Sequence, residues 1–208
     1  MPATATPQDT PTRTRILDVA EELFASGGFA KTSVRDLAGR VGITPASLYN
    51  HFRSKQVLYE AVLERGVRPL LELLQSLSDV DDEGEPEQDV IEAVMAHLSR
   101  HPRVPRLVYH EAVSGGEHLA PLARRWIRPL VMQGVDAMKR TQPSPWDEDE
   151  APLVIAAWLH LIFGYFATAP LMEEIVGADP LAPASIVQQT RFLGKLARLM
   201  REAGHPNS

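Results

Sequence analysis

Short polar side chains gather around the predicted start of a helix in the segment 44–51. Its outward face carries two hydroxyls, a methyl group, an aromatic ring and an amide, which belong to Thr44, Ser47, Ala46, Tyr49 and Asn50. Such groups suit hydrogen bonds to base edges, contact with thymine methyl groups and contact with a sugar-phosphate backbone. The segment is therefore a candidate for reading a nucleic-acid groove through non-covalent contacts.

The residues around this segment have the spacing of a helix-turn-helix over 34–52. Ala38 is small where two helices would cross, and Gly42 suits a turn that requires a positive φ angle. Leu48 would face the hydrophobic centre of the unit. The spacing alone is only moderately specific, because any pair of helices joined by a tight turn can show it.

The rest of the sequence is helical in pattern and has no convincing run of alternating apolar and polar residues. We predict an all-α fold of about nine helices, which span 12–26, 34–41, 44–52, 54–76, 88–100, 103–114, 119–141, 149–167 and 185–202. Gly27-Gly28 is expected to end the first helix, because glycine adopts the left-handed C-terminal cap at low cost. Side-chain caps are expected at Thr32 or Ser33, at Thr44 and at Ser54.

A wider pattern of residues is much more specific than the spacing. It comprises Gly28-Phe29-Ala30-Lys31-Thr32-Ser33-Val34, Leu37-Ala38, Val41-Gly42-Ile43-Thr44, Leu48-Tyr49-Asn50-His51-Phe52, Ser54-Lys55 and Leu58. In these residues the sequence strongly resembles the DNA-binding domain of the TetR family of bacterial transcriptional regulators, over residues 12–60. It departs from the family at Pro45-Ala46, where many members have a basic or polar residue followed by glycine.

The resemblance implies a division of the chain and a set of DNA contacts. Residues 1–53 would form an N-terminal tail and a three-helix helix-turn-helix domain, and residues 54–208 a ligand-binding and dimerisation domain that begins with a connecting helix at 54–76. The residues expected to contact DNA are Thr32, Ser33, Arg35, Thr44, Pro45, Ala46, Ser47, Tyr49, Asn50, His51 and Lys55. Among them, the resemblance assigns Lys55 to a phosphate and Thr44 to Ser47 to the bases.

The resemblance also implies a homodimer that is joined through its last two long helices and reads an inverted repeat in double-stranded DNA. The residues expected at the dimer interface are Trp158, Ile162, Phe192, Leu196 and Leu199. A small, largely apolar effector is expected to contact His97, Tyr109, His110, Trp126, Trp158 and Tyr165. Taken singly, each of these aromatic residues is more often a core residue than a ligand contact. The expected function is a ligand-responsive repressor, while activation, the operator and the identity of the effector stay open.

Composition and motifs argue against other classes of protein. The net charge of −6 over 208 residues disfavours a non-specific polyanion binder, although residues 1–55 hold seven Lys and Arg against five Asp and Glu. Cysteine is absent, and there is no nucleophile elbow, phosphate-binding glycine loop or zinc motif. We therefore expect no enzyme activity, cofactor or metal. An architectural DNA binder without a ligand is the alternative, and the large, aromatic-rich body argues against it.

The segment 151–172 is apolar enough to be weighed as a membrane span. Pro152, His160 and Pro170 are costly inside a bilayer, and acidic residues flank both ends. A helix that is apolar on every face is otherwise a buried core helix. We expect a cytoplasmic protein without a membrane partner, in which a second copy of the chain helps to cover this helix.

Overall fold

The computed structural model describes residues 12–78, 86–140, 146–147 and 149–202 of the chain. Within those residues the regular secondary structure is helical throughout, so the predicted all-α fold is confirmed. Eleven α-helices and one π-helical turn replace the nine helices predicted. They are α1 (Thr12–Lys31), α2 (Val34–Val41), α3 (Pro45–His51), α4 (Lys55–Ser78), α5 (Pro86–Arg100), α6 (Arg103–Val113), α7 (Ala120–Leu122), the π-helical turn η1 (Ala123–Ile127), α8 (Arg128–Arg140), α9 (Ala151–Ala167), α10 (Ala169–Val176) and α11 (Pro183–Glu202).

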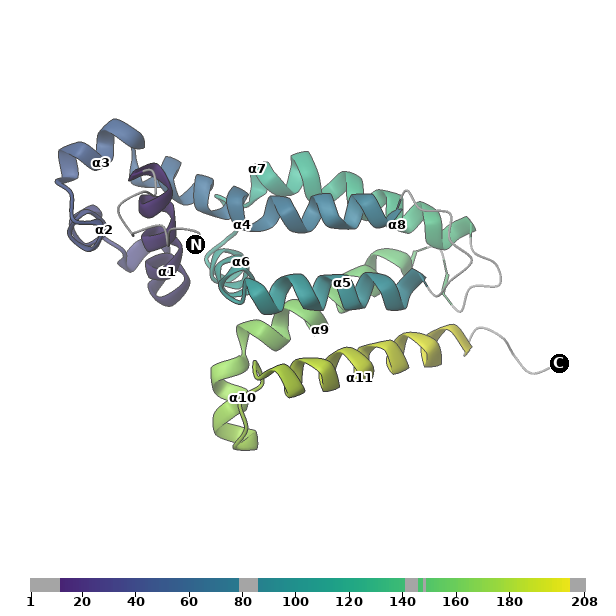
Figure 1. The fold of residues 1–208 in the computed structure, drawn as a ribbon. Coiled ribbons are helices and arrows are strands. Elements are labelled where there is room, and N and C mark those ends of the chain that lie inside the picture. The colour runs from purple at the N-terminus through teal and green to yellow at the C-terminus, as the bar shows by residue number, and fades with distance from the viewer. Residues whose placement is uncertain (1–11, 79–85, 141–145, 148, 203–208) are drawn as a thin grey trace, which may run out of the picture.

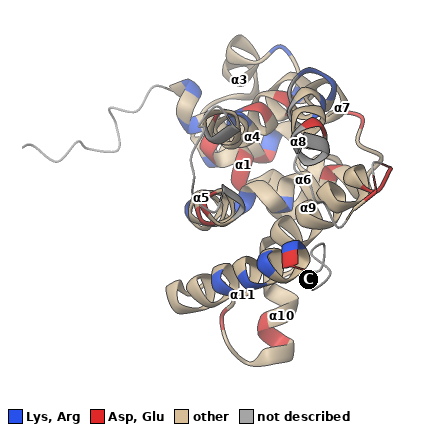
Figure 2. Cartoon of the chain, turned by 90° about the vertical axis from the view of Figure 1, so that its right-hand side faces the viewer, with Lys and Arg blue, Asp and Glu red and all other residues tan. Residues whose placement is uncertain are grey.

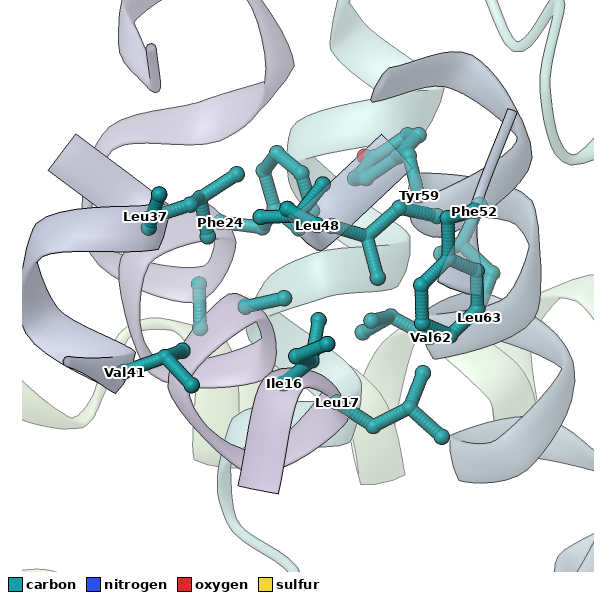
Figure 3. Packing of buried hydrophobic residues seen from close by; sticks show 14 of the residues in the cluster. Ile16, Leu17, Phe24, Leu37, Val41, Leu48, Phe52, Tyr59, Val62 and Leu63 are labelled. Atoms are coloured by element: carbon teal, nitrogen blue, oxygen red, sulfur yellow. The ribbon is translucent and has the colours of Figure 1, made fainter. Parts of the chain in front are cut away.

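Helices α1 to α3 lie at one end of the molecule, and α4 leads from them into the remaining helices (Figure 1). We call residues 12–53 the head and residues 54–202 the body. Buried side chains from all three helices fill the head (Figure 3), among them Ile16, Leu17, Phe24, Leu37, Val41 and Leu48. The same cluster takes in Leu58, Tyr59, Val62 and Leu63 from α4 and Leu107 from α6. Head and body therefore share one hydrophobic core.

Local signals in the sequence set the helix ends of the head. Ser33 caps α2, because its Oγ accepts the backbone N–H of Asp36 at 3.1 Å. Ser54 does the same for α4 by accepting the backbone N–H of Val57 at 3.1 Å. At the end of α1 the predicted break occurs at Gly28, with a φ angle of 73°, but helical residues follow it as far as Lys31. The first helix is thus kinked rather than ended by its glycine pair.

An ion pair joins α1 to the connecting helix α4. The guanidinium of Arg65 bonds to Asp18 Oδ1 and to Glu21 Oε2, each at 2.7 Å. Two donors on a planar guanidinium fix direction as well as distance. Arg65 therefore helps to set the angle at which α4 leaves the head.

A second hydrophobic cluster fills the body. It consists of Leu70, Ile91, Val94, Met95, Leu98, Ile162, Phe166 and Leu193, which come from α4, α5, α9 and α11. Figure 1 shows α5 lying between α4 on one side and α11 on the other. This cluster holds the last helix against the middle of the body.

The segment 119–141, predicted as one helix, is instead built from α7, η1 and α8 in direct succession. Pro129 has no N–H to donate to the carbonyl of Arg125, four residues earlier, so the regular α-helical pattern is lost there. The wider π-helical turn ends at Ile127, just before this proline. Residue 141 lies outside the described residues.

Helix α10 follows α9 at a bend of 70° and is missing from the sequence-based prediction. Thr168 ends α9, and Pro170 in the first turn of α10 needs no hydrogen-bond acceptor. Over the described residues no single helix is long and apolar enough to cross a membrane, and only the bent pair α9 and α10 passes by length and composition together. In the single chain α9 is buried on one side and exposes Leu153 and Leu159 on another.

Candidate nucleic-acid interface

The N-terminal half of α3 presents its side chains to solvent. The Oγ1 of Thr44 accepts the backbone N–H of Ser47 at 3.1 Å, and Pro45 occupies the first turn, as predicted. The exposed residues here are Thr44, Pro45, Ala46, Tyr49, Asn50 and His51, while Ser47 is half-buried. Nearly half of the surface of Tyr49, 48%, is exposed. The helix start therefore offers one hydroxyl-rich, aromatic face to a partner.

The opposite face of α3 is anchored in the head. Leu48 is fully buried, and the turn before α3 passes through Gly42 with a φ angle of 78°, as the spacing predicted. The N–H of Gly42 bonds back to the carbonyl of Ala38, which closes the end of α2. A guanidinium nitrogen of Arg15 also donates to the carbonyl of Val41 at 2.7 Å. The exposed face of α3 is therefore held on a rigid support.

The two residues before α2 have different environments. Ser33 is exposed, and its hydroxyl donates to Asp36 Oδ2 at 2.6 Å. Thr32 is only 5% exposed, and its hydroxyl donates to the carbonyl of Gly28 at 2.9 Å. Of the two predicted caps, Ser33 is the one that forms. Thr32 instead closes the end of α1, so the structure turns this predicted DNA contact inward.

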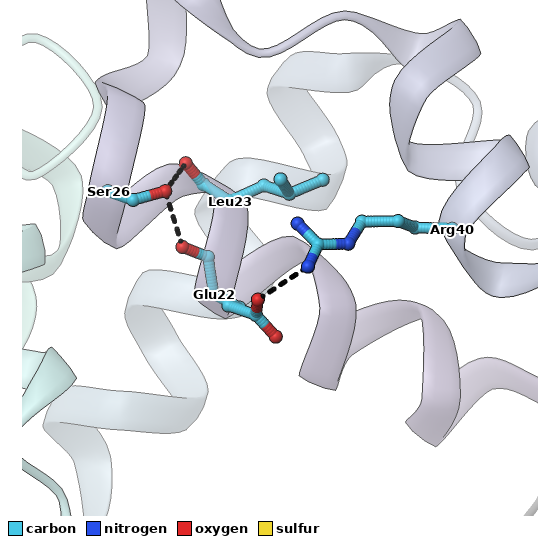
Figure 4. Close-up of polar contacts among 4 residues, drawn as sticks. All are labelled: Glu22, Leu23, Ser26 and Arg40. Atoms are coloured by element: carbon cyan, nitrogen blue, oxygen red, sulfur yellow. Dashed lines mark hydrogen bonds and ion pairs between the residues drawn. The ribbon is translucent and has the colours of Figure 1, made fainter.

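The arginine residues of the head have different partners. The guanidinium carbon of Arg13 lies 4.9 Å from the centre of the Phe52 ring, a cation–π contact. Arg40 in α2 pairs with Glu22 Oε1 of α1 at 2.9 Å (Figure 4). The hydroxyl of Ser26, also in α1, donates to the backbone carbonyl of Glu22. Arg35, which the sequence singled out, is exposed. The positive charge available to a phosphate thus comes from a few individual residues at defined positions.

Lys55, the first residue of α4, lies over an aromatic ring. Its Nζ is 4.2 Å from the centre of the Phe29 ring, and the residue is half-buried. Burial lowers the pKa of Lys55 from its ordinary value, because desolvation disfavours the charged form. A phosphate at this point would restore a counter-charge to the ammonium group.

A family model for the bacterial regulatory proteins of the tetR family matches residues 16–62. Over 167 residues the chain is 34% identical to the HTH-type transcriptional repressor Rv3405c of Mycobacterium tuberculosis, covering 80% of this chain and 78% of that protein. The chain belongs to the tetR family. The HTH-type transcriptional regulator UidR of Escherichia coli is 29% identical over 197 residues, and the match covers 88% of this chain and 91% of UidR. A crystal structure of a tetR-family regulatory protein from Rhodococcus RHA1 shares the fold, with a TM-score of 0.69, 20% identity, and coverage of 92% of this chain and 97% of that one.

Membership of the tetR family makes this chain a transcriptional regulator with a helix-turn-helix DNA-binding domain, and not an enzyme. The matched residues 16–62 contain α2, α3 and the anchored turn between them. The candidate interface described above is therefore the part of the regulator that carries the family's DNA-binding motif.

The residues expected to contact an effector in this tetR-family regulator have different surroundings. His110 lies against α1, with its Nδ1 3.6 Å from the position that a Cβ would take at Gly28, and the hydroxyl of Tyr165 donates to the carbonyl of Pro180. Tyr109 and Trp158 are half-buried, and His97 is buried. The side chain of Trp126 lies outside the described residues.

One cavity of about 240 Å³ lies between the start of α6 and the bend that joins α9 to α10. Its lining includes Arg103, Arg106, Phe166, Ala169, Asp179 and Leu181, and none of His97, Tyr109, His110, Trp158 and Tyr165, the expected effector contacts whose side chains the structure describes. The lining combines apolar side chains with charged groups of both signs. Sequence periodicity missed this site because it forms only where the bend at Thr168 brings α10 near α6.

The residues expected at a dimer interface of the tetR-family regulator divide into two groups. Phe192 and Leu199, seven residues apart on α11, are exposed at 55% and 52%. Trp158 and Leu196 are half-buried, and Ile162 is buried in the second cluster of the same chain. Figure 2 shows basic residues along α11, namely Arg191, Lys195, Arg198 and Arg201. The exposed side of α11 is therefore an apolar pair among basic residues.

Proposed function

We propose that this regulator is a repressor that binds an inverted-repeat operator as a homodimer and is released by a small, largely apolar effector bound in the body. In this proposal residues 1–53 meet DNA, and residues 54–208 hold the effector and the partner subunit. The observation that carries it is the solvent-facing start of α3, whose opposite face is anchored by Leu48 and by the turn at Gly42.

We assign direct base contacts to the exposed start of α3, over residues 44–47, with Asn50 one turn further on. A helix enters the major groove with its N-terminal residues against base edges, and hydroxyls, methyl groups and amides can distinguish bases there. We assign phosphate contacts to Ser33, Arg35, Tyr49, His51 and Lys55. Thr32 contributes by closing α1, since its hydroxyl is already bonded to Gly28.

A homodimer is supported by apolar surface on the two long helices α9 and α11. Leu153 and Leu159 of α9 and Phe192 and Leu199 of α11 are all exposed in the single chain. Exposed large apolar side chains are typical of an interface when they form a contiguous patch, which this proposal requires of these four residues. A two-fold dimer would set its recognition helices about 34–36 Å apart, one turn of the duplex, which is why an inverted repeat is the expected operator.

Repression is supported by the Mycobacterium tuberculosis relative, which is named as a repressor. Effector binding is supported by the cavity at the start of α6, because Phe166, Ala169 and Leu181 give its lining an apolar part. An effector changes DNA affinity only through its different affinities for two arrangements of the heads.

The test is selection of DNA from a random duplex library with the full chain, at about 150 mM salt where non-specific binding is weak. We expect enrichment of an inverted repeat with half-sites about one duplex turn apart. Asn50→Ala should relax the preference at one position in each half-site, and Gln75→Ala, at an exposed site of α4, should leave the motif unchanged. Recovery of no motif by folded, dimeric protein would overturn the proposed operator.

A further inference from the structure

A buried carboxylate lies where the head meets the body. Glu111 of α6 is only 2% exposed. It accepts the backbone N–H of His118 at 2.7 Å, and its Oε1 is 3.2 Å from the Nδ1 of the same residue. The hydroxyl of Tyr59 in α4 lies near this carboxylate, and burial, followed by the charge of Glu111, raises the pKa of Tyr59, so the hydroxyl keeps its proton.

The hydrogen bonds join Glu111 to His118, and the ring contact between His118 and Tyr59 extends the link to α4. A buried carboxylate that loses its donors is strongly destabilising, because it has been removed from water without compensation. His118 follows Gly115 and Gly116, whose φ angles of 106° and 73° bring the chain back towards α6. Glu111 therefore holds the His118 ring in one place against α4.

The His118 ring forms one wall around Phe29 of α1. Its centre lies 4.5 Å from that of Phe29 and 5.2 Å from that of Tyr59, and the Phe29 and Tyr59 ring centres are 5.0 Å apart. The Phe29 ring also stacks on Phe24 and lies beneath the ammonium group of Lys55. These contacts on a half-buried ring restrict its freedom to change rotamer.

We propose that Glu111 and His118 are positioning residues for DNA binding: they hold Phe29 in place, and Phe29 holds the ammonium group of Lys55 towards the phosphate. The inference rests on the proposed phosphate contact of Lys55. It connects α6 directly to a DNA contact of the head, so a shift of α6 that moves Glu111 would weaken that contact without moving α3.

The test measures how the affinity for a mixed-sequence DNA duplex changes with salt concentration, in wild type and variants of the full chain. Affinity falls as salt rises, and each neutralised phosphate steepens the plot of log affinity against log salt by about 0.9. Lys55→Gln should therefore make this plot less steep by about 0.9 per head. His118→Ala should reduce the steepness by at least half as much as Lys55→Gln does. His118→Phe, which keeps a ring against Phe29, should restore most of the steepness lost in His118→Ala. His101→Ala, at the exposed histidine that follows α5, is the matched control and should leave the steepness unchanged.

A double-mutant cycle separates positioning from a general loss of stability. In the Lys55→Gln background, His118→Ala should cost little further affinity, because the contact that it positions is already gone. Equal losses in both backgrounds, or a slope unchanged by His118→Ala, would overturn the inference while the phosphate contact of Lys55 stands. A slope unchanged by Lys55→Gln would overturn that contact and the inference together. Thermal unfolding of each variant identifies any that fails to fold, and His118→Phe then carries the comparison.

Discussion

The hydroxyl oxygen of Tyr109 lies 3.1 Å from the position that a Cβ would occupy at Gly164. Helices α6 and α9 therefore approach one another closely here, and a Cβ at Gly164 would require the Tyr109 ring to shift by a few tenths of an ångström. The contact joins the helix that touches the head to the helix with the most apolar sequence.

Replacing Gly164 by alanine tests this close approach. Alanine favours a helix by about 0.8–1.0 kcal/mol over glycine, but crowding a packed site costs about 1–3 kcal/mol. We expect Gly164→Ala to lower the free energy of unfolding by about 1 kcal/mol, measured by urea denaturation. The same change in a Tyr109→Phe background should be neutral or stabilising, since the clashing oxygen is gone. Equal effects in both backgrounds would contradict the contact.

Two glycines near the turn before α3 are expected to respond in opposite ways to replacement by alanine. Gly42 has a φ angle of 78°, whereas Gly39 lies inside α2 with nothing within 4 Å of its Cβ position. Gly42→Ala should lower the free energy of unfolding by about 1–2 kcal/mol, because an L-residue is strained in the left-handed region. Gly39→Ala should raise it by about 0.5–1 kcal/mol. Calorimetric melting of both variants measures the two changes in stability. If Gly42→Ala does not lower stability, the turn does not require the left-handed conformation at this position.

His97 predicts how stability changes with pH. Burial lowers the pKa of His97 below 6.5, followed by repulsion from His101 and Arg100, and its Nε2 has no hydrogen-bond partner in the described part of the chain. The His97 imidazole therefore binds a proton more readily in the unfolded chain than in the folded one. Its contribution to the free energy of unfolding is complete above pH 6.5 and is lost as the pH falls below that value.

Urea midpoints between about pH 7.5 and about pH 5 measure this effect. We expect His97→Gln to be less stable than wild type near neutral pH, and the difference to narrow as the pH falls. His101→Gln, at the exposed neighbour, should keep most of the wild-type slope. A constant gap between wild type and His97→Gln would show that His97 is not the group responsible.

The apolar pair on α11 predicts the oligomeric state. Phe192→Glu combined with Leu199→Glu should weaken dimerisation at least roughly 10-fold, because central apolar contacts carry most of the binding energy of an interface. Val113→Glu, at an exposed apolar residue of α6, is the control and should leave the dimer intact. Sedimentation velocity measures the mass of each protein. A dimer unaffected by the double substitution would place the interface elsewhere.

The sequence alone determined the class of fold and the local architecture of the head. The positive φ angle at Gly42 and the caps at Thr44 and Ser54 were all predicted, and each depends on groups no more than four residues apart. Such short-range geometry is present in the order of residues itself. The same reasoning left the cap before α2 open between Thr32 and Ser33, because both hydroxyls have suitable spacing and only burial distinguishes them.

Only the tertiary structure decided how the head is joined to the body. Arg65 meets Asp18 and Glu21 across 44 residues or more, and no periodicity in the sequence indicates the pairing. Glu111 is buried because α6 packs on α1 and α4 together, although a lone glutamate on a helix predicts an exposed side chain. Periodicity shows which side of a helix is apolar, but the partner of that side depends on how distant helices are placed in space.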